Sequence, residues 1–184
     1  MEKQEKTISK IPTKTLIQKI QQGKIFIYPT DTIYGLGCDA ENKKAVSKIK
    51  SIKSRDKDKP ISIIAPSIKW IKENCQIPST MKLNKYLPGP YTLILKKQNP
   101  KFLTHISKTE TIGIRIPKNP LTKQIQKSEK PFITTSVNLA GQPPIININE
   151  IPKKIEKQVD IIINQGPLTG KPSTLIIEGK EVRR

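Results

Sequence analysis

The sequence Pro-Thr-Asp-Thr-Ile-Tyr-Gly-Leu-Gly at residues 29–37 decides how this chain folds, because it joins an apolar run to a polar stretch. The run before it, Lys24–Tyr28, predicts a strand. The stretch itself is expected to be a loop, since it gathers hydroxyls, a carboxylate and glycines. Strand ends that lead into such loops are where α/β proteins place ligands, and a threonine and aspartate turn that caps a helix is the alternative.

Helical and strand patterns alternate on both sides of this stretch. Helices are expected at Thr13–Gln22, Lys43–Ile52, Ile68–Asn74, Ser79–Leu87, Leu121–Lys127 and Asn149–Lys157. Further strands are expected at Ile61–Ala65, Tyr91–Lys96, Thr111–Ile116, Phe132–Thr135, Ile161–Ile163 and Thr174–Ile177. The alternation predicts a layered arrangement of helices around one sheet, and no linker divides the chain.

The whole sequence is 184 residues long, with a formal net charge of +19 and two cysteines, Cys38 and Cys75. This length supports one hydrophobic core, and two isolated cysteines make neither a disulfide framework nor a zinc site. No apolar run reaches the roughly 18 residues of a membrane helix, and the N-terminus lacks a signal peptide pattern, so we expect a cytoplasmic protein with no membrane partner. The charge favours a polyanionic partner such as nucleic acid or nucleotide, and a compositional bias toward lysine is the alternative.

Two basic segments are candidate anion sites. Lys53-Ser54-Arg55 follows a predicted helix, and in extended backbone its two cations would share one face and could clamp a phosphate. Solvated surface charge is the alternative. Arg115 places one guanidinium inside the otherwise apolar strand Thr111–Ile116, where an unpaired charge is costly. It therefore requires an anion, which is either a ligand or the partner in a structural salt bridge.

A further polar segment, residues 134–141, ends another predicted strand with hydroxyls and an amide. These groups could bond to carboxylate or phosphate oxygens of a substrate, and helix capping by Ser136 or Asn138 is the alternative. Residues 166–173 lack the spacing of a P-loop, and the single histidine, His105, lies in no metal or catalytic-triad pattern. The sequence thus offers cations, hydroxyls and loop amides, which position substrates and stabilise charge. No protein metal site is predicted.

Taken in order, these segments resemble the YrdC-like family of threonylcarbamoyl-AMP synthases. The matching motifs are residues 29–36, Lys53-x-Arg55 with Pro60, Leu-Pro-Gly-Pro-Tyr-Thr at 87–92, Ile-Arg-Ile-Pro at 114–117, Ser136-x-Asn138-x-x-Gly141 and Pro-Ser-Thr at 172–174. The resemblance implies an α+β fold, a three-layer α/β domain with a strongly twisted mixed sheet and a positively lined groove. It implies the short form of the family, one domain over residues 1–184 with a core of about 8–183.

The implied activity is that of a nucleotidyltransferase that makes L-threonylcarbamoyladenylate and pyrophosphate from L-threonine, bicarbonate and ATP with Mg²⁺. This is the first step of threonylcarbamoyladenosine formation in tRNA, so the tRNA threonylcarbamoyl-transferase machinery is the implied partner. By the family pattern, Lys53 and Arg55 would be catalytic. L-threonine would be bound by Thr30, Thr32, Tyr34, Arg115, Thr134 and Ser173. The nucleotide would be bound by Lys53, Arg55, Thr111, Ser136, Asn138 and Arg183, with Arg184 an open alternative for the last position.

Two other functions are compatible with the same fold. A non-enzymatic module that binds tRNA or rRNA would need the basic surface but not a threonine-sized polar pocket. The joint presence of Lys53, Arg55, Arg115 and the Ser136-x-Asn138 motif therefore favours the enzyme. The related domain of hydrogenase-maturation carbamoyltransferases makes a carbamoyl adenylate, but those chains are large and contain zinc-finger cysteines. Oligomeric state, direct tRNA binding and preference for threonine over serine do not follow from the residues.

Overall fold

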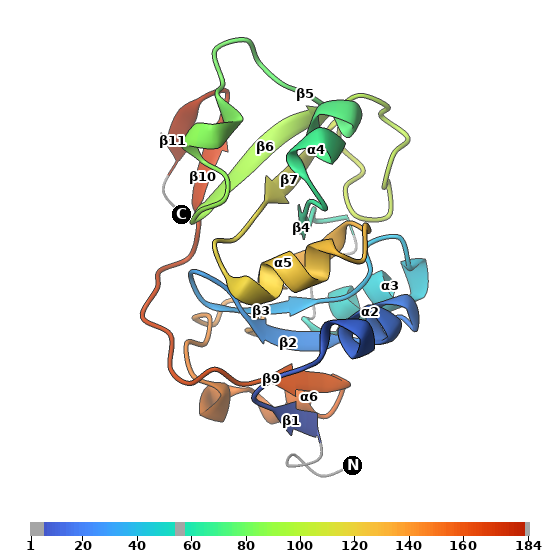
Figure 1. Cartoon of the computed structure of the whole chain (residues 1–184), viewed down its shortest axis with the longest axis vertical. Coiled ribbons are helices and arrows are strands. Elements are labelled where there is room, and N and C mark those ends of the chain that lie inside the picture. Colours follow the sequence, from blue (N-terminus) through green and yellow to red (C-terminus); the bar gives the residue numbers. More distant parts are fainter. Residues whose placement is uncertain (1–5, 54–57, 183–184) are drawn as a thin grey trace.

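The computed structural model describes residues 6–53 and 58–182, and it is built around one mixed sheet (Figure 1). The strand order is β1-β9-β2-β3-β8-β4-β7-β6-β10-β11, with β5 paired to β6 outside this path. The strands are β1 (Thr7–Ile8), β2 (Phe26–Pro29), β3 (Tyr34–Gly37), β4 (Ser62–Ile64), β5 (Cys75–Gln76), β6 (Tyr91–Lys97), β7 (Thr111–Arg115), β8 (Phe132–Ser136), β9 (Ile161–Ile163), β10 (Thr174–Ile177) and β11 (Lys180–Val182). Within the described ranges, no helix is long and apolar enough to cross a membrane.

Helices cover both faces of the sheet. They are α2 (Thr13–Gln21), α3 (Lys43–Ile52), α4 (Ile68–Asn74), α5 (Pro120–Gln126) and α6 (Lys153–Glu156), with the 3-10 turns η1 (Leu83–Lys85) and η2 (Ile148–Glu150). Because side chains alternate along a strand, Phe26, Tyr28 and Phe132 pack in one core with α2 and α5. Their neighbours Ile27 and Ile133 belong to a second core that includes α3. Two cores on one sheet make three layers, which confirms the predicted α+β fold class.

Residues 34–37 form strand β3, whereas the sequence predicted a loop there. Glycine is unfavourable within strands, but packing requires it at this position. A Cβ on Gly35 would lie 2.9 Å from the Tyr28 ring, and one on Gly37 would meet the Ile133 carbonyl oxygen. Strand β3 pairs antiparallel with both β2 and β8, so the polar turn at residues 30–33 reaches the middle of the sheet.

Two predicted helices are wrong in part. Residues 79–87 contain only η1, because Met81 and Leu83 are both buried and residues two apart cannot share one helical face. The predicted helix at residues 149–157 is divided into η2 and α6, since Pro152 has no N–H for a continuous helix. The short strands β1, β5 and β11 were not predicted, because two or three residues show no periodicity. The other predicted elements are present, with ends that differ by at most two residues.

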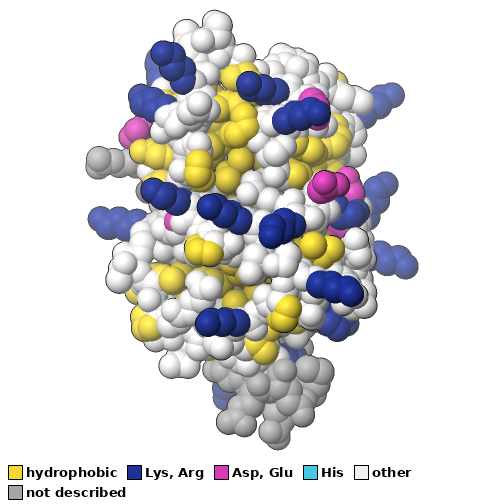
Figure 2. Space-filling view, viewed as in Figure 1, with side chains coloured by type: hydrophobic (Ala, Val, Ile, Leu, Met, Phe, Trp, Pro, Cys, Tyr) yellow, Lys and Arg dark blue, Asp and Glu magenta, His cyan; other side chains and the backbone are white. Residues whose placement is uncertain are grey.

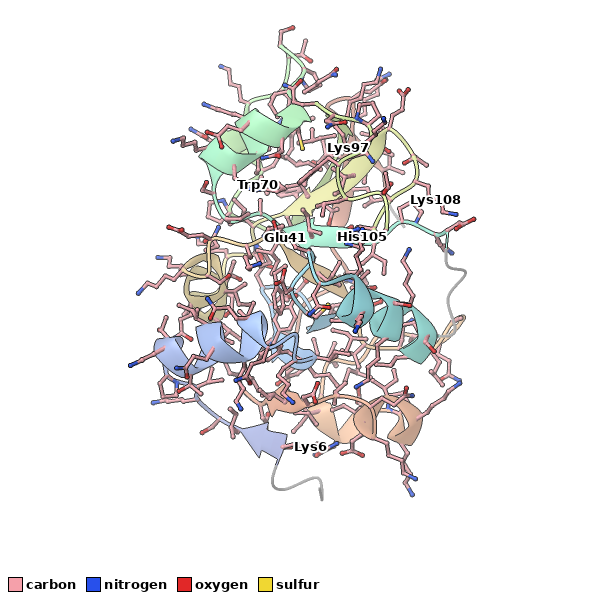
Figure 3. All side chains as sticks on the ribbon, turned by 90° about the vertical axis from the view of Figure 1, so that its right-hand side faces the viewer. Lys6, Glu41, Trp70, Lys97, His105 and Lys108 are labelled. Carbon is pink, nitrogen blue, oxygen red and sulfur yellow. The ribbon has the colours of Figure 1, made fainter. Side chains whose placement is uncertain are left out.

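A buried lysine organises the upper part of the molecule. The Lys97 ammonium donates to the carbonyl oxygens of Pro100, Phe102 and Ser107 at 2.9, 3.1 and 3.0 Å (Figure 3). Burial lowers the pKa of Lys97, and the three carbonyls offset part of the cost of desolvating the cation. These hydrogen bonds hold the connection between β6 and β7 in place. The other end of β7, at Arg115, lies at the site described next.

Candidate functional site: a cleft over the sheet

A cleft of about 520 Å³ lies over the part of the sheet beyond α2 and α5. On β8, Phe132 packs beneath these helices, while Thr134 and Ser136, two and four residues farther along the same face, line the cleft. The neighbouring strands continue this surface, since Ser62 of β4 pairs with Thr134. The polar residues that line the cleft are Thr30, Tyr34, Lys59, Ser62, Thr92, Arg115, Thr134, Thr135, Ser136 and Ser173.

Most of the residues predicted to bind L-threonine meet in this cleft. Thr30, Tyr34, Arg115, Thr134 and Ser173 all line it, although they come from widely separated parts of the sequence. The remaining member, Thr32, is not a lining residue, but its Oγ1 atom lies 2.9 Å from Thr30 Oγ1. The structure therefore brings the predicted set together, and its role in binding threonine stays a prediction.

Arg115 combines the two alternatives that its sequence position left open. It ends β7, its side chain is only 8 % exposed, and its Nη2 atom lies 2.9 Å from Asp31 Oδ1 in a buried salt bridge. Nη2 also donates to Thr32 Oγ1 at 3.2 Å. Because Arg115 lines the cleft as well, the salt bridge and ligand contact are compatible.

Lys53 does not adopt the extended conformation that was predicted, because it caps the C-terminus of α3 with helical φ and ψ angles of −77° and −3°. Its buried ammonium donates to Ser136 O at 2.5 Å, Asn138 Oδ1 at 2.8 Å and Asn138 O at 3.2 Å. Ser136 Oγ in turn donates to Asn138 Oδ1 at 2.6 Å. The two motifs predicted to bind nucleotide are thus hydrogen-bonded to each other. Ser136 and Asn138 bind the Lys53 ammonium instead of capping a helix. Among the described residues that line the cleft, Ser136 is present, and Lys53 and Asn138 are not.

None of the other three residues predicted to bind nucleotide is found among the described residues that line the cleft. Thr111 begins β7 on the same face as Gly113 and Arg115, but beyond the residues that line the cleft. Its hydroxyl lies 3.2 Å from Thr109 Oγ1. Arg55 and Arg183 fall outside the described residues. Their roles stay predictions.

Four further residues line the cleft without having been predicted as site residues, namely Lys59, Ser62, Thr92 and Gly113. A glycine in the middle of an apolar strand signals close approach, and a Cβ on Gly113 would meet Ser62 Oγ. Thr92 Oγ1 lies 2.8 Å from Ser173 Oγ, which joins β6 to the start of β10. In the sequence Lys59 is one of many lysines, and only the tertiary structure shows that it lines the cleft.

Segment 164–173 connects β9 in the lower half of the molecule to β10 in the upper half (Figure 1). Its last residues, Pro172 and Ser173, line the cleft. The Tyr34 hydroxyl donates to Gly166 O at 2.7 Å and accepts from Gln165 N at 3.1 Å. Burial raises the pKa of Tyr34, so this phenol stays protonated at neutral pH. Gly170 packs so closely that a Cβ there would meet the Thr32 carbonyl oxygen. The segment therefore holds the polar turn in place and delivers Ser173 to the cleft.

The charges of the cleft suit an anionic ligand. Lys59 and Arg115 are the charged side chains among its described lining residues, and none of these is a carboxylate. In the described part of the chain, no group of three or more His, Cys, Asp or Glu residues could hold a metal ion. Cations with many hydroxyl donors can bind carboxylate and phosphate oxygens.

The fold and the cleft together define an α+β domain with a cleft over the sheet that is lined by cations and hydroxyls. Residues 18–183 match the Sua5, YciO and YrdC family, described as "Telomere recombination", and the chain belongs to this family. A protein from Methanocaldococcus jannaschii, whose name provisionally assigns it as a threonylcarbamoyl-AMP synthase, is 40% identical over 164 residues, 88% of this chain and 77% of the relative. Threonylcarbamoyl-AMP synthase from Pseudoalteromonas atlantica is 34% identical over 160 residues, 82% of this chain and 83% of the relative.

A solved structure shows the same fold. The crystal structure of P. abyssi Sua5 complexed with L-threonine superposes with a TM-score of 0.80 at 27% identity, covering 93% of this chain and 53% of that protein. This chain therefore spans about half the length of that Sua5. The family membership and the fold confirm the resemblance drawn from the sequence motifs.

Proposed function

We propose that this chain is a threonylcarbamoyl-AMP synthase, a nucleotidyltransferase that joins L-threonine, bicarbonate and ATP. The observation that carries the proposal is the convergence of Thr30, Tyr34, Arg115, Thr134 and Ser173 in one cleft. A non-enzymatic basic surface has no need of such a set. The names of the relatives and the L-threonine complex of P. abyssi Sua5 support the same activity.

The residues match the demands of the reaction. The amine of L-threonine takes up carbon from bicarbonate with loss of water, and an oxygen of the resulting carbamate attacks the α-phosphorus of ATP. The bond from that phosphorus to the pyrophosphate oxygen breaks, and pyrophosphate leaves with the added negative charge. In our proposal Arg115 binds the threonine carboxylate, and Thr30, Thr134 and Ser173 bond to its polar atoms. Lys59 and the loop at Ser136 face the phosphates, where fixed donors stabilise developing charge.

Mg²⁺ enters this scheme with the ATP substrate. The cleft offers hydroxyl oxygens, but its described lining residues include no carboxylate for a resident magnesium ion. The phosphates of ATP are the natural ligands in such a site. The ion would neutralise part of the negative charge of the phosphates. Lys59 and the donors of the Ser136 loop would then balance only the rest.

The proposal is tested by pyrophosphate release from ATP, bicarbonate and Mg²⁺, with and without L-threonine. L-serine and carbamoyl phosphate serve as substrate controls. We expect release that depends on both threonine and bicarbonate. Arg115→Ala should lower kcat/KM about 10²- to 10³-fold, as loss of one charge-stabilising donor does, while the exposed Lys101→Ala should behave as wild type. Release that carbamoyl phosphate alone supports would instead indicate a carbamoyl adenylate synthase.

One observation favours nucleic acid binding as a second function. A hollow at the opposite end of β2 from the cleft is lined by one carboxylate, that of Asp160, and by lysines from separate parts of the chain, Lys6, Lys19, Lys24, Lys48 and Lys157. Lys6 lies at the lower end of the molecule (Figure 3). Asp160 Oδ1 lies 3.6 Å from the Lys24 ammonium, and the other lysines leave the hollow with a net positive charge that would attract an anion. No pyrophosphate release with any substrate, together with salt-sensitive tRNA binding, would make this the main function.

A further inference from the structure

Asp31 lies in the polar turn between Thr30 and Thr32, and the sequence analysis assigned it no role. Its Oδ1 atom accepts a hydrogen bond from Arg115 Nη2 at 2.9 Å, and its Oδ2 atom accepts one from the Lys118 backbone N–H at 2.8 Å. Both charged side chains are nearly buried, at 8 % exposure for Arg115 and 9 % for Asp31. The two oxygens therefore tie the end of β7 to the turn after β2.

The ion pair continues into the hydroxyls of the turn. Arg115 Nη2 also donates to Thr32 Oγ1 at 3.2 Å, and Thr32 Oγ1 lies 2.9 Å from Thr30 Oγ1. Thr30 Oγ1 donates to Ile33 O at 2.7 Å, which anchors the other end of the network. Thr30 and Arg115 line the cleft, and Asp31 is not among its lining residues. Any effect of Asp31 on a ligand is thus transmitted through the groups that it holds.

An arginine side chain has many rotamers, and ordering one costs free energy at the moment of binding. A buried carboxylate with a fixed backbone partner removes that cost in advance, because the guanidinium is already oriented. Asp31 also neutralises part of the charge of Arg115, so Arg115 is not an uncompensated buried cation when no ligand is bound.

We infer that Asp31 is a positioning residue that fixes the Arg115 guanidinium for the carboxylate of the amino-acid substrate. The inference rests on the proposed function, since that function names the amino acid as the ligand of Arg115. Asp31 acts on substrate binding, before the chemical step, and it acts at the end of the cleft where Arg115 lies. Its loss should therefore weaken threonine binding and leave ATP binding unchanged.

The test compares Asp31→Asn with Asp39→Asn. Asp39 is a matched control because it is also buried, lies 3.2 Å from the Lys130 ammonium and accepts a backbone N–H, that of Glu41, at 2.9 Å. It lines no part of the cleft. Both variants lose an ion pair, so both should lower the melting temperature.

For Asp31→Asn, we expect the KM for L-threonine to rise about 10- to 100-fold, as when the partner that orients a binding group is removed. The KM for ATP should stay within about twofold of wild type. Asp39→Asn should leave both values unchanged. Asp31→Glu, which keeps the charge, should recover part of the threonine affinity and provides a second variant if Asp31→Asn does not fold.

Calorimetric titration of each protein with L-threonine separates the two proposals. A wild type that binds no threonine overturns the proposed function and this inference with it. A wild type that binds threonine, beside a folded Asp31→Asn with the same affinity, overturns only this inference. Equal losses in Asp31→Asn and Asp39→Asn would also overturn it, because the effect would then be one of stability.

Discussion

Lys53 shows at the scale of a single residue how a cation can act through its neighbours. Its ammonium bonds to the backbone and side chain of Asn138 and to the backbone of Ser136. Without the lysine, the backbone oxygens of Ser136 and Asn138 would lose this donor and Asn138 Oδ1 would keep the Ser136 hydroxyl, and the loss is costly because these residues are half-buried. The lysine therefore fixes the geometry of the Ser136 loop at the edge of the cleft.

Replacing this lysine tests that role. Lys53→Ala is expected to lower pyrophosphate release about 10²- to 10³-fold, because the donors of the Ser136 loop lose their preorganised positions. The exposed Lys44→Ala on the same helix is the control and should keep wild-type activity. Wild-type turnover in Lys53→Ala would show that the loop needs no lysine.

The two thiols provide a prediction for pH. Cys38 and Cys75 are buried, and burial raises the pKa of Cys75 to about 11 and raises that of Cys38 as well. An unfolded thiol ionises near pH 8.5, so the native state holds these protons to higher pH. The thiol contribution to the free energy of unfolding is complete below about pH 8.5 and decreases as the pH rises toward 11.

Thiol reactivity measures this difference. At about pH 9, Ellman's reagent should modify the native protein slowly, because the thiols are protonated and covered. In urea at the same pH, both cysteines should react rapidly. Rapid modification of the native protein would contradict the burial of these side chains.

At the scale of elements, contacts with segment 164–173 hold the polar turn at residues 30–33 in place. The segment has no strand or helix of its own and depends on close contacts with Tyr34 and Thr32. Gly170 is the tightest of these contacts, since the atom that a Cβ would meet is backbone and cannot rotate away. An added methyl group must therefore move the segment or the turn.

Gly170→Ala is expected to lower kcat/KM for threonine about 10- to 100-fold, because a displacement of about 1 Å disturbs the alignment of bound groups. The adjacent exposed Lys171→Ala is the control and should have little effect. The measurement is pyrophosphate release at varied threonine concentration. Unchanged kinetics in Gly170→Ala would show that the segment adapts without disturbing the turn.

At the scale of the whole molecule, the net charge of +19 is distributed over the surface. Lysine and arginine side chains are spread over the face in Figure 2, with few acidic ones between them. Such a distribution attracts polyanions without selecting a site. The lysine-lined hollow described above brings together five lysines from separate parts of the chain with one carboxylate, that of Asp160.

A charge-matched pair of variants tests whether that hollow binds nucleic acid. The triple variant Lys19→Gln, Lys48→Gln and Lys157→Gln should reduce the salt dependence of log K for tRNA by about 2–3 units of slope, close to one for each phosphate that a lysine no longer neutralises. The control replaces the exposed Lys72, Lys82 and Lys101 with glutamine, which changes the net charge equally. Equal slopes in the two variants would show that the surface binds RNA only through its total charge.

Elements with local signals could be predicted from the amino-acid sequence. Helices α3 and α4 and strands β9 and β10 have the predicted ends. The helix starts are set by caps within three residues, Asn42 to Ala45 and Ser67 to Trp70. The residues predicted to bind L-threonine were also identified from the sequence, because the family resemblance preserves their order along the chain, and their role in binding stays a prediction.

Which of these residues lie together could be seen only once the chain was folded. Asp31 and Arg115 are 84 positions apart, and Lys53 and Ser136 are 83 apart. Their pairing depends on the strand order, which places β3, β8, β4 and β7 side by side. Strand β3 itself depends on the Tyr28 ring and the Ile133 carbonyl, which leave no space for a side chain. Hydrophobic periodicity reports which face of an element is buried, but it does not specify which other element covers that face.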